Sequence, residues 1–327
     1  MTTLPTSKTK RERRMYRSTA SISLFIVALP LLVGCQPPPP APEGLDASTS
    51  YLVTNFYADD ATFQAGVQGF MNWFQEEGFE LIDLENTAEN VSEAFTVGQL
   101  SDEDIAQLPI TGGRNVEDAA GIVSIAEMQC SVTESEALLM RGDQDVLFDD
   151  WEGYDREFLT SREEYALATG SEEFAAVPTS LTPFDADFDG SLYASTLLQT
   201  VNQVDPSPIF GGLADLDDYE MNLDFRHGVF AIGEEFIPGF AILTFIREGA
   251  TGPAGANHLH QSYSIEINLA QSNGTTLRML AVWAEPEGAN LSPDDPLVLN
   301  YAVTKSRDAS ERMTELCDGT LEVPSEE

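Results

Sequence analysis

Four β-rich runs follow one another closely in the C-terminal half of the sequence, and they constrain the fold more than any other feature. Between the last two, Gln271-Ser272-Asn273-Gly274 is a hairpin turn signal. Residues 264–269 alternate polar and apolar side chains, which predicts a strand with one buried and one solvent-facing side. The pattern therefore predicts an antiparallel sheet. The four runs are 221–232, 236–247, 258–270 and 275–284.

The remaining sequence mixes helical and strand patterns. Phe63, Val67 and Phe70 recur at spacings of three and four, which predicts a helix over 60–77. The chain is thus predicted to be α+β, with a mixed α/β half at 51–210. An antiparallel sheet with a closing C-terminal helix is expected at 211–327. Further strands are expected over 51–56 and 297–303, and further helices over 133–141, 191–204 and 309–316.

The order of strands followed by a closing helix resembles that of helix-grip ligand-binding proteins. In that architecture, a curved sheet wraps around a long C-terminal helix and encloses an apolar pocket. The resemblance rests on the order of the elements and on no motif residues. It implies a pocket protein that binds an apolar ligand.

The N-terminus has the features of an export signal. A basic segment from Lys8 to Arg17 precedes a short apolar run at 22–33. That run is shorter than the roughly 20 residues that a membrane-spanning helix needs. It ends in Leu32-Val33-Gly34-Cys35, which resembles the lipobox of bacterial lipoprotein precursors. The resemblance implies that 1–34 is a signal peptide and that Cys35 is lipidated as the mature N-terminus. It also implies anchoring to a membrane of the bacterial cell envelope, at the outer membrane or the periplasmic face.

A proline-rich segment follows Cys35. Residues 36–44 contain five prolines and are expected to adopt an extended polyproline II conformation. Small polar residues continue to position 50. The sequence therefore predicts a spacer over 35–50 that lifts the folded body away from the lipid.

The charge balance excludes one class of partner. The chain has 16 Lys and Arg against 55 Asp and Glu, and residues 1–34 hold six of the basic residues and one of the acidic residues. The mature chain therefore has a net charge of about −44. Such a surface repels phosphates, so nucleic-acid binding is not expected. The acidic residues are spread along the chain, which favours a solvated acidic surface over specific binding of divalent cations.

Two cysteines, Cys130 and Cys317, remain after Cys35. An exported protein meets an oxidising compartment, in which an even pair of cysteines predicts a disulfide. No cysteine would then be available as a nucleophile, and the sequence contains no serine nucleophile elbow and no phosphate-binding loop. No catalytic residue is assigned.

The best candidate for a metal site is Asp185-Ala186-Asp187-Phe188-Asp189-Gly190. Its alternate aspartates and glycine resemble the first positions of an EF-hand calcium loop. The loop departs from the pattern at its twelfth position, where Thr196 replaces the bidentate glutamate. Weak calcium binding by Asp185, Asp187 and Asp189 is one interpretation, and a solvated turn is the other.

A second candidate involves His258, His260 and Glu266. In a continuous strand these residues share one side, and their spacing resembles a stretched first motif of the cupins, which bind a transition metal. The glutamate lies one residue too far along, and no histidine follows position 260. A pair of hydrogen-bonded histidines at a strand start is the alternative.

Three functional hypotheses follow. The leading one is an exported, lipid-anchored protein with a non-catalytic role in binding, interaction or envelope support. The first alternative is a cupin-like metal-dependent enzyme that uses His258, His260 and Glu266. The second is a helix-grip-like protein that binds an apolar ligand. No partner other than the membrane is identified.

Overall fold

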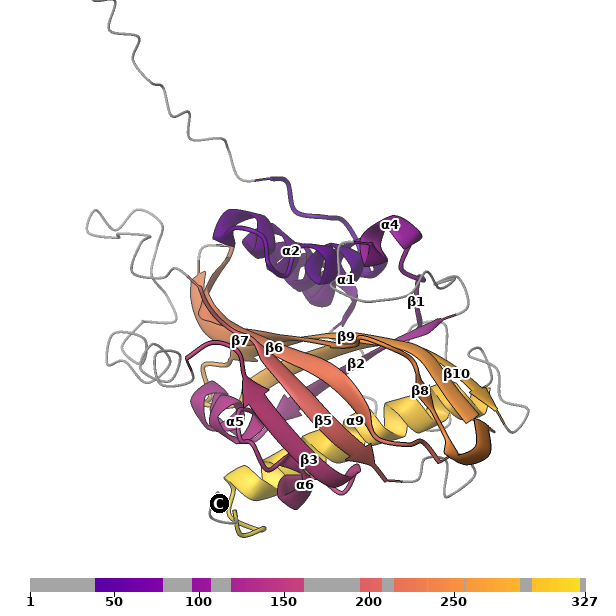
Figure 1. Ribbon diagram of the computed structural model, residues 1–327. Helices are drawn as coiled ribbons and strands as arrows, with labels where there is room; N and C mark the ends of the chain where they lie inside the picture. Colours follow the sequence, from indigo (N-terminus) through magenta and orange to yellow (C-terminus); the bar gives the residue numbers. More distant parts are fainter. Residues whose placement is uncertain are drawn as a thin grey trace, which may run out of the picture. The chain divides into compact units, whose positions relative to one another are not determined.

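The protein is built around one antiparallel sheet with helices on both sides (Figure 1). The structure, a computed structural model, describes residues 39–78, 96–106, 119–161, 195–207, 215–233, 235–255, 257–288 and 296–323. All of these belong to one compact unit, 38–327. The predicted α+β class is confirmed.

In the part of the chain that the structure describes, ten strands form the sheet, in the order β1-β2-β10-β9-β7-β6-β5-β3, with β4 beside β6 and β8 beside β9. All neighbouring strands are antiparallel. Strands from 51–210 and from 211–327 therefore share one sheet. Their bounds are β1 Thr96–Val97, β2 Ala120–Met128, β3 Trp151–Phe158, β4 Thr196–Leu198, β5 Thr200–Pro206, β6 Tyr219–Ile232, β7 Glu235–Ile246, β8 Ala250–Thr251, β9 Asn257–Ala270 and β10 Thr276–Gly288.

The four predicted C-terminal runs are confirmed as β6, β7, β9 and β10. The turn between β9 and β10 is the expected one, because the Gly274 amide donates to the Gln271 carbonyl at 3.0 Å. Gly274 has a φ of 87°, which glycine adopts without steric strain. This hairpin fixes the register of the two central strands.

One face of the sheet, here called the α1–α2 face, is covered by two helices, α1 (Leu45–Thr54) and α2 (Asp60–Trp73) (Figure 1). A π-helical turn, η1 (Phe74–Gly78), follows α2. Phe63 and Phe70 of α2 belong to the same buried core as Phe245, Tyr263 and Trp283 of the sheet. A short helix, α4 (Asp102–Ile105), lies beside α1.

The opposite face, here called the α9 face, carries the long C-terminal helix α9 (Pro296–Cys317), which packs on β2 and touches α5 (Val132–Leu139). The predicted helix over 133–141 is confirmed as α5. Two short helices, α6 (Gln144–Leu147) and η6 (Pro253–Gly255), complete the described elements. In the described part of the chain, no helix is long and apolar enough to cross a membrane.

The predicted strand over 51–56 is wrong, because α1 occupies Leu45–Thr54. Residues 45–50, expected in the spacer, also lie in this helix. The hydroxyls of Ser48 and Thr49 donate to carbonyls one turn earlier, and Leu52 and Val53 are buried against the sheet. Core packing therefore overrides the strand propensity of this run. Even Pro42 lies on the body, because a Cβ at Gly69 of α2 would come within 2.5 Å of its carbonyl oxygen.

Two further element predictions are wrong. The described part of the expected helix at 191–204 forms β4 and β5. The expected strand at 297–303 is the first half of α9. In β5 the inward-facing positions include the polar residues Thr200 and Asn202, so an apolar period does not reveal the strand. In the first half of α9, the buried Val298 and Val303 are five residues apart, which does not follow the helical period.

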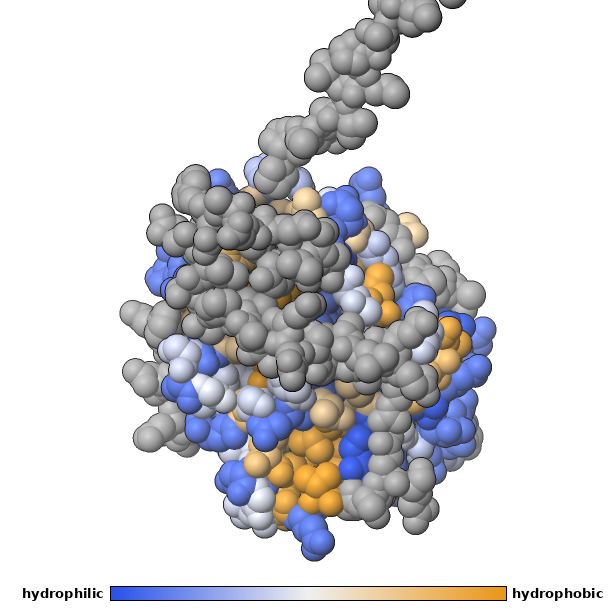
Figure 2. Space-filling view, turned by 90° about the vertical axis from the view of Figure 1, so that its left-hand side faces the viewer, coloured by the Kyte–Doolittle hydropathy of each residue, from blue (hydrophilic) through white to orange (hydrophobic). Residues whose placement is uncertain are grey.

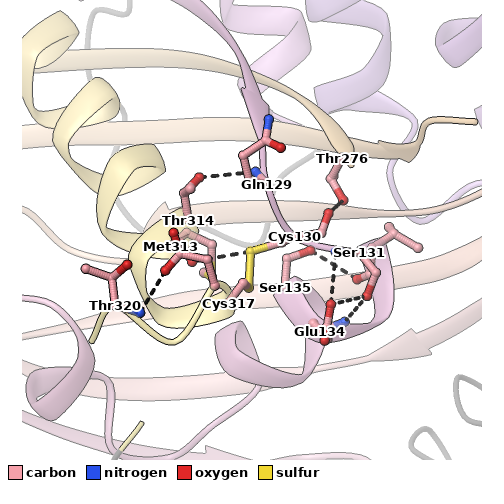
Figure 3. The surroundings of a disulfide bond; sticks show 12 residues. Gln129, Cys130, Ser131, Glu134, Ser135, Thr276, Met313, Thr314, Cys317 and Thr320 are labelled. Carbon is pink, nitrogen blue, oxygen red and sulfur yellow. Dashed lines mark hydrogen bonds between the residues drawn. A yellow bond between two sulfur atoms is a disulfide. The ribbon is translucent and has the colours of Figure 1, made fainter. Parts of the chain in front are cut away.

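The disulfide prediction is confirmed: Cys130 and Cys317 lie at bonding distance, with Cα atoms 5.4 Å apart (Figure 3). Cys130 lies between the end of β2 and the start of α5, and Cys317 ends α9. The Gln129 amide also donates to the Thr314 hydroxyl at 3.2 Å. The end of α9 is therefore attached to β2 by a covalent bond and a hydrogen bond.

Candidate functional site

A stripe of polar side chains runs along β9 on the α9 face, where the sequence predicts a solvated surface. We call Ser262, Ser264, Glu266 and Asn268 the β9 polar stripe. The two serines are partly exposed, whereas Glu266 and Asn268 are buried. The prediction of a wet face is therefore wrong for the deeper half of the stripe. Polar groups buried in a central strand need hydrogen-bond partners.

Glu266 finds its partner on the neighbouring strand. The Arg278 guanidinium of β10 donates to Glu266 Oε2 at 2.7 Å, and both side chains are nearly buried, at 12% and 9% exposed. Arg278 also donates to the Ser306 carbonyl and the Ser310 hydroxyl of α9, at 3.2 and 2.8 Å. This ion pair therefore connects the middle of the sheet to the C-terminal helix.

Asn268 extends the same network. Its Nδ2 donates to Glu266 Oε1 at 2.8 Å, which fixes the orientation of the amide, since the reverse orientation would bring two oxygens together. The side chain is fully buried, and its Oδ1 has no hydrogen-bond partner in the described structure. An unsatisfied acceptor at such a position is unusual and calls for an explanation.

Helix α9 bridges two sides of the α9 face (Figure 1). On one side, the Ser306 hydroxyl donates to Ser124 of β2 at 2.7 Å. On the other, Lys305 donates to Asp150, just before β3, at 2.6 Å, and Arg312 donates to the Leu147 carbonyl at 2.9 Å. Burial alone would lower the pKa of Lys305, but the hydrogen bond and charge of Asp150 outweigh it and raise the pKa. Lysine therefore stays charged at this contact.

Between these attachments, the central strands are not fully covered. Leu223, Thr244, Ser264 and Val282 stand opposite one another across β6, β7, β9 and β10, and all four are partly exposed. We call this row the exposed band. The core residues beside it on the opposite face, such as Phe245 and Tyr263, are buried. Solvent therefore reaches the middle of the sheet on the α9 face.

An apolar flank borders the exposed band on the side of β3, β5 and β6. Burial raises the pKa of Tyr154 and Tyr219, so both phenols stay neutral. Tyr154 donates to Asn202 at 2.8 Å, which turns its polar end into the network of β5. The band thus meets the apolar flank at Leu223 and crosses the β9 polar stripe at Ser264. The flank consists of Trp151, Tyr154, Val204, Tyr219, Met221, Leu223, Ile246 and Leu259.

Helix α5 covers the far end of this face. His227 of β6 lies 2.7 Å from Glu136 of α5, and both side chains are buried. The Arg156 guanidinium donates to Asn202 and to the Leu139 carbonyl, each at 2.7 Å. These contacts hold α5 against the sheet beside the apolar cluster of Phe225, Phe240 and Ile242.

Figure 2 shows the side of the molecule on which α5 and α6 lie in Figure 1. An apolar patch is visible near the lower edge of this view, bordered by hydrophilic residues. Large apolar residues that are well exposed are few in the described ranges: Val146, Leu159 and Val323. These three residues are exposed singly, which is normal on protein surfaces and identifies no site.

The structure does not assemble the cupin-like site. His258 and His260 stack with ring centres 5.5 Å apart, and His260 Nε2 lies 2.5 Å from Glu287. That hydrogen bond lowers the pKa of Glu287. Glu266 lies six residues further along β9, about 20 Å away at the rise of a strand. It is already paired with Arg278, so it is not available as the third ligand.

Four predicted site positions, Asp185, Asp187, Asp189 and Cys35, lie outside the described residues. Within the described ranges, no group of three or more His, Cys, Asp or Glu side chains is arranged to hold a metal ion.

The sequence predicts a different role for Glu266, as a metal ligand, and it predicts no role for Asn268, Arg278 or the serines of α9. The polar positions at every second residue of β9 were the available signal. Arg278 stands directly opposite Asn268 in the register, which only the pairing of β9 with β10 reveals.

No protein family model matches the sequence, and no curated protein matches it. Three solved structures resemble the chain weakly. A START superfamily protein from Mycobacterium smegmatis is 9% identical, with a TM-score of 0.33, over 62% of this chain and 99% of that one. Ara h 8.0201 is 14% identical, with a TM-score of 0.30, over 62% and 99%. The Zhui aromatase/cyclase from Streptomyces sp. R1128 is 8% identical, with a TM-score of 0.30, over 61% and 94%. These scores are too low to assign a fold family or a function.

Proposed function

We propose that the chain is an exported, lipid-anchored protein whose body binds an amphiphilic small molecule on the α9 face of its sheet. The observation that supports this most directly is the exposed band of Leu223, Thr244, Ser264 and Val282. These residues lie on central strands, which a packed helix normally buries. Here α9 is attached on both sides of the face and leaves the middle open to solvent.

The two surfaces that the band meets, the apolar flank and the β9 polar stripe, suggest the chemistry of the ligand. The apolar flank offers aromatic and aliphatic surface, whose burial contributes about 25 cal/mol per Å². The β9 polar stripe offers hydroxyl, amide and carboxylate groups on the other side. A purely apolar ligand would leave the stripe desolvated without partners, which is unfavourable. An amphiphile can contact both the apolar flank and the polar stripe, so we prefer it to the apolar ligand implied by the helix-grip resemblance.

A metal-dependent enzyme is less well supported. It would need Glu266 beside His258 and His260, whereas Glu266 is paired with Arg278. We therefore retain a non-catalytic binding role.

The binding proposal is tested by native mass spectrometry of the purified full-length protein. We expect an amphiphile bound near one-to-one. Thr244→Trp should fill the band and reduce occupancy at least tenfold, while Thr244→Val keeps the volume and should leave it unchanged. Ser272→Trp, in the exposed hairpin turn, controls for the added indole. A wild-type protein that carries no amphiphile and takes up none in detergent-free exchange contradicts the proposal.

Membrane anchoring is a separate proposal, supported by the lipobox-like tetrapeptide that ends at Cys35. We expect the mature protein to begin at a lipid-modified Cys35 and to fractionate with membranes. Cys35→Ser should leave an unprocessed precursor, whereas Ser50→Ala, within α1, should be processed normally. An unmodified Cys35 thiol in the mature wild-type protein, measured by mass spectrometry, contradicts it.

A further inference from the structure

We infer that the ligand presents a neutral hydrogen-bond donor, such as a hydroxyl or an amide N–H, to Asn268. This inference rests on the proposed function and specifies the polar end of the amphiphile. Its starting point is the buried Asn268 Oδ1, which has no partner in the described structure. Because Nδ2 is held by Glu266, the amide cannot turn over to present a donor instead.

The charges around Asn268 favour a neutral group over an ion. Glu266 and Arg278 neutralise each other at 2.7 Å, and the other Arg278 contacts go to Ser306 and Ser310. Arg156, another cation on this face, donates to Asn202 and to backbone and phenol oxygens. An anionic head group would therefore meet arginines that already have partners, and a cationic one would meet a carboxylate that is already neutralised. Burying either ion without a counter-charge is unfavourable.

The geometry of β9 connects this position to the exposed band. Ser264 belongs to the band, and Asn268 lies four residues deeper, about 13 Å away at the rise of a strand. Exposure decreases in the same direction, from the partly exposed Ser264 to Glu266 and then to the fully buried Asn268. The inference therefore requires that the ligand pass Glu266, between the sheet and α9, to place its head at Asn268 and its apolar body on the band.

A buried water molecule is the competing explanation, because such waters commonly satisfy isolated acceptors. The two explanations differ in whether Asn268 contributes to ligand selectivity. If a structural water satisfies Asn268 Oδ1, the dissociation constant of the ligand should not depend on whether its head group is a hydrogen-bond donor.

The test measures dissociation constants of four probes with the same twelve-carbon chain: 1-dodecanol, its methyl ether, dodecanoate and dodecylammonium. We expect wild-type protein to bind the alcohol at least tenfold more tightly than the ether, and more tightly than either ion. Asn268→Leu, which keeps the number and branching of the side-chain heavy atoms, should bind alcohol and ether equally. Thr244→Trp should weaken all four probes together.

Three outcomes overturn the inference. Equal binding of alcohol and ether by wild-type protein, or tightest binding of an ion, excludes a neutral donor at Asn268 while leaving the proposed function intact. Discrimination that persists in Asn268→Leu shows that another group recognises the head. Failure of wild-type protein to bind any probe, with no amphiphile co-purifying, overturns the proposed function as well. The comparison among probes needs only wild-type protein, so it remains decisive if Asn268→Leu does not fold.

Discussion

Asp224 is a buried carboxyl group on the α1–α2 face of β6. Tyr57 donates to its Oδ2 at 2.5 Å, and the Thr200 amide donates to Oδ1 at 2.8 Å. Burial raises the pKa of Asp224 above its ordinary value, and these hydrogen bonds only partly oppose the increase. Burial, with the nearby negative charge, also raises the pKa of Tyr57. The folded protein therefore holds the Asp224 proton more tightly than the unfolded chain does.

This predicts a pH-dependent difference between wild type and Asp224→Asn. Because the folded state binds more protons, the stability that wild type derives from this group is present below the unfolded pKa, near 3.8. It is lost as the pH rises through the folded pKa, at about 1.4 kcal/mol per pH unit between the two values. Asp224→Asn should therefore gain stability relative to wild type between pH 3.5 and 7, measured by urea unfolding.

Asp308→Asn on the exposed side of α9 provides the control, and its difference from wild type should stay within about 0.5 kcal/mol. A constant difference between Asp224→Asn and wild type across this range would show that the Asp224 pKa is not raised by folding.

At the scale of elements, Arg226 attaches the helical pair to the sheet. Its guanidinium donates to the Phe56 and Ala58 carbonyls, at 2.6 and 2.9 Å, and to Asp60 at 2.8 Å. It also stacks over the Phe63 ring at 4.4 Å. Burial lowers the pKa of Arg226, and the hydrogen bond and charge of Asp60 partly oppose this effect. One arginine therefore holds the segment that joins α1 to α2 and the first residue of α2.

We predict that Arg226→Met destabilises the protein by about 3 kcal/mol or more, because it leaves buried carbonyl oxygens without donors. Hydrogen exchange should show α1 and α2 losing protection before β7 and β9. Arg307→Met is the matched control: that arginine is half exposed, its ion pairs are 3.5 and 3.8 Å long, and its loss should change little. Similar losses for the two variants in urea unfolding would exclude the attachment role.

The sequence predicts the central strands and α2, whose buried sides are apolar, but it misassigns α1, β4, β5 and the first half of α9. The central strands alternate apolar residues on the α1–α2 face, so their pattern is readable. In α9, the inward positions Val303, Ser306, Ser310, Met313 and Cys317 follow a helical spacing of three and four, but two of them are serines. The helix period is therefore hidden, although the last turns carry enough apolar residues to predict a helix there.

The candidate site is predictable only in part, for the same physical reason. Alternate polar residues mark β9 as unusual, but sequence alone assigns them to solvent. Their burial depends on α9 and Arg278, which come from elsewhere in the chain and meet β9 only through the sheet register. Glu266 was recognised as chemically important, yet its partner could not be read from spacing along one strand.

At the scale of the whole molecule, acidic charge dominates. The net charge is −39, and Arg226, Arg278, Arg312 and Lys305 are all engaged with acids or carbonyls of the body. The exposed acidic side chains therefore repel one another, with few basic side chains between them to offset the repulsion. Self-repulsion of this kind destabilises the compact state and is screened by salt.

We predict that the melting temperature rises as sodium chloride increases from 10 to 150 mM, because the Debye length falls from about 30 to about 8 Å. Each kcal/mol of relief corresponds to about 2–4 °C for a domain of roughly this size. Potassium chloride should act equally. A melting temperature that is flat or falls with salt, measured by calorimetry, contradicts dominant self-repulsion.

The same measurement addresses the proposed calcium loop. Millimolar calcium at matched ionic strength should raise the melting temperature further if Asp185, Asp187 and Asp189 bind it, and Asp187→Ala should remove that increment. Equal responses of both proteins to calcium and to chelator would leave only the solvated turn.

The disulfide has a mechanical consequence for a protein held at one end. Cys130 and Cys317 are separated by 187 residues, and strands β3 to β10 all lie between them. A force applied between Cys35 and the C-terminus would be carried by the disulfide, so the residues between Cys130 and Cys317 would not be extended. Helices α1 and α2, outside the loop, would yield first. Single-molecule stretching should therefore reveal about 640 Å of additional contour length only after reduction, at about 3.4 Å per residue. A tethered molecule could lose its helical pair under load and still keep the strands that carry Asn268 and Glu266 unextended.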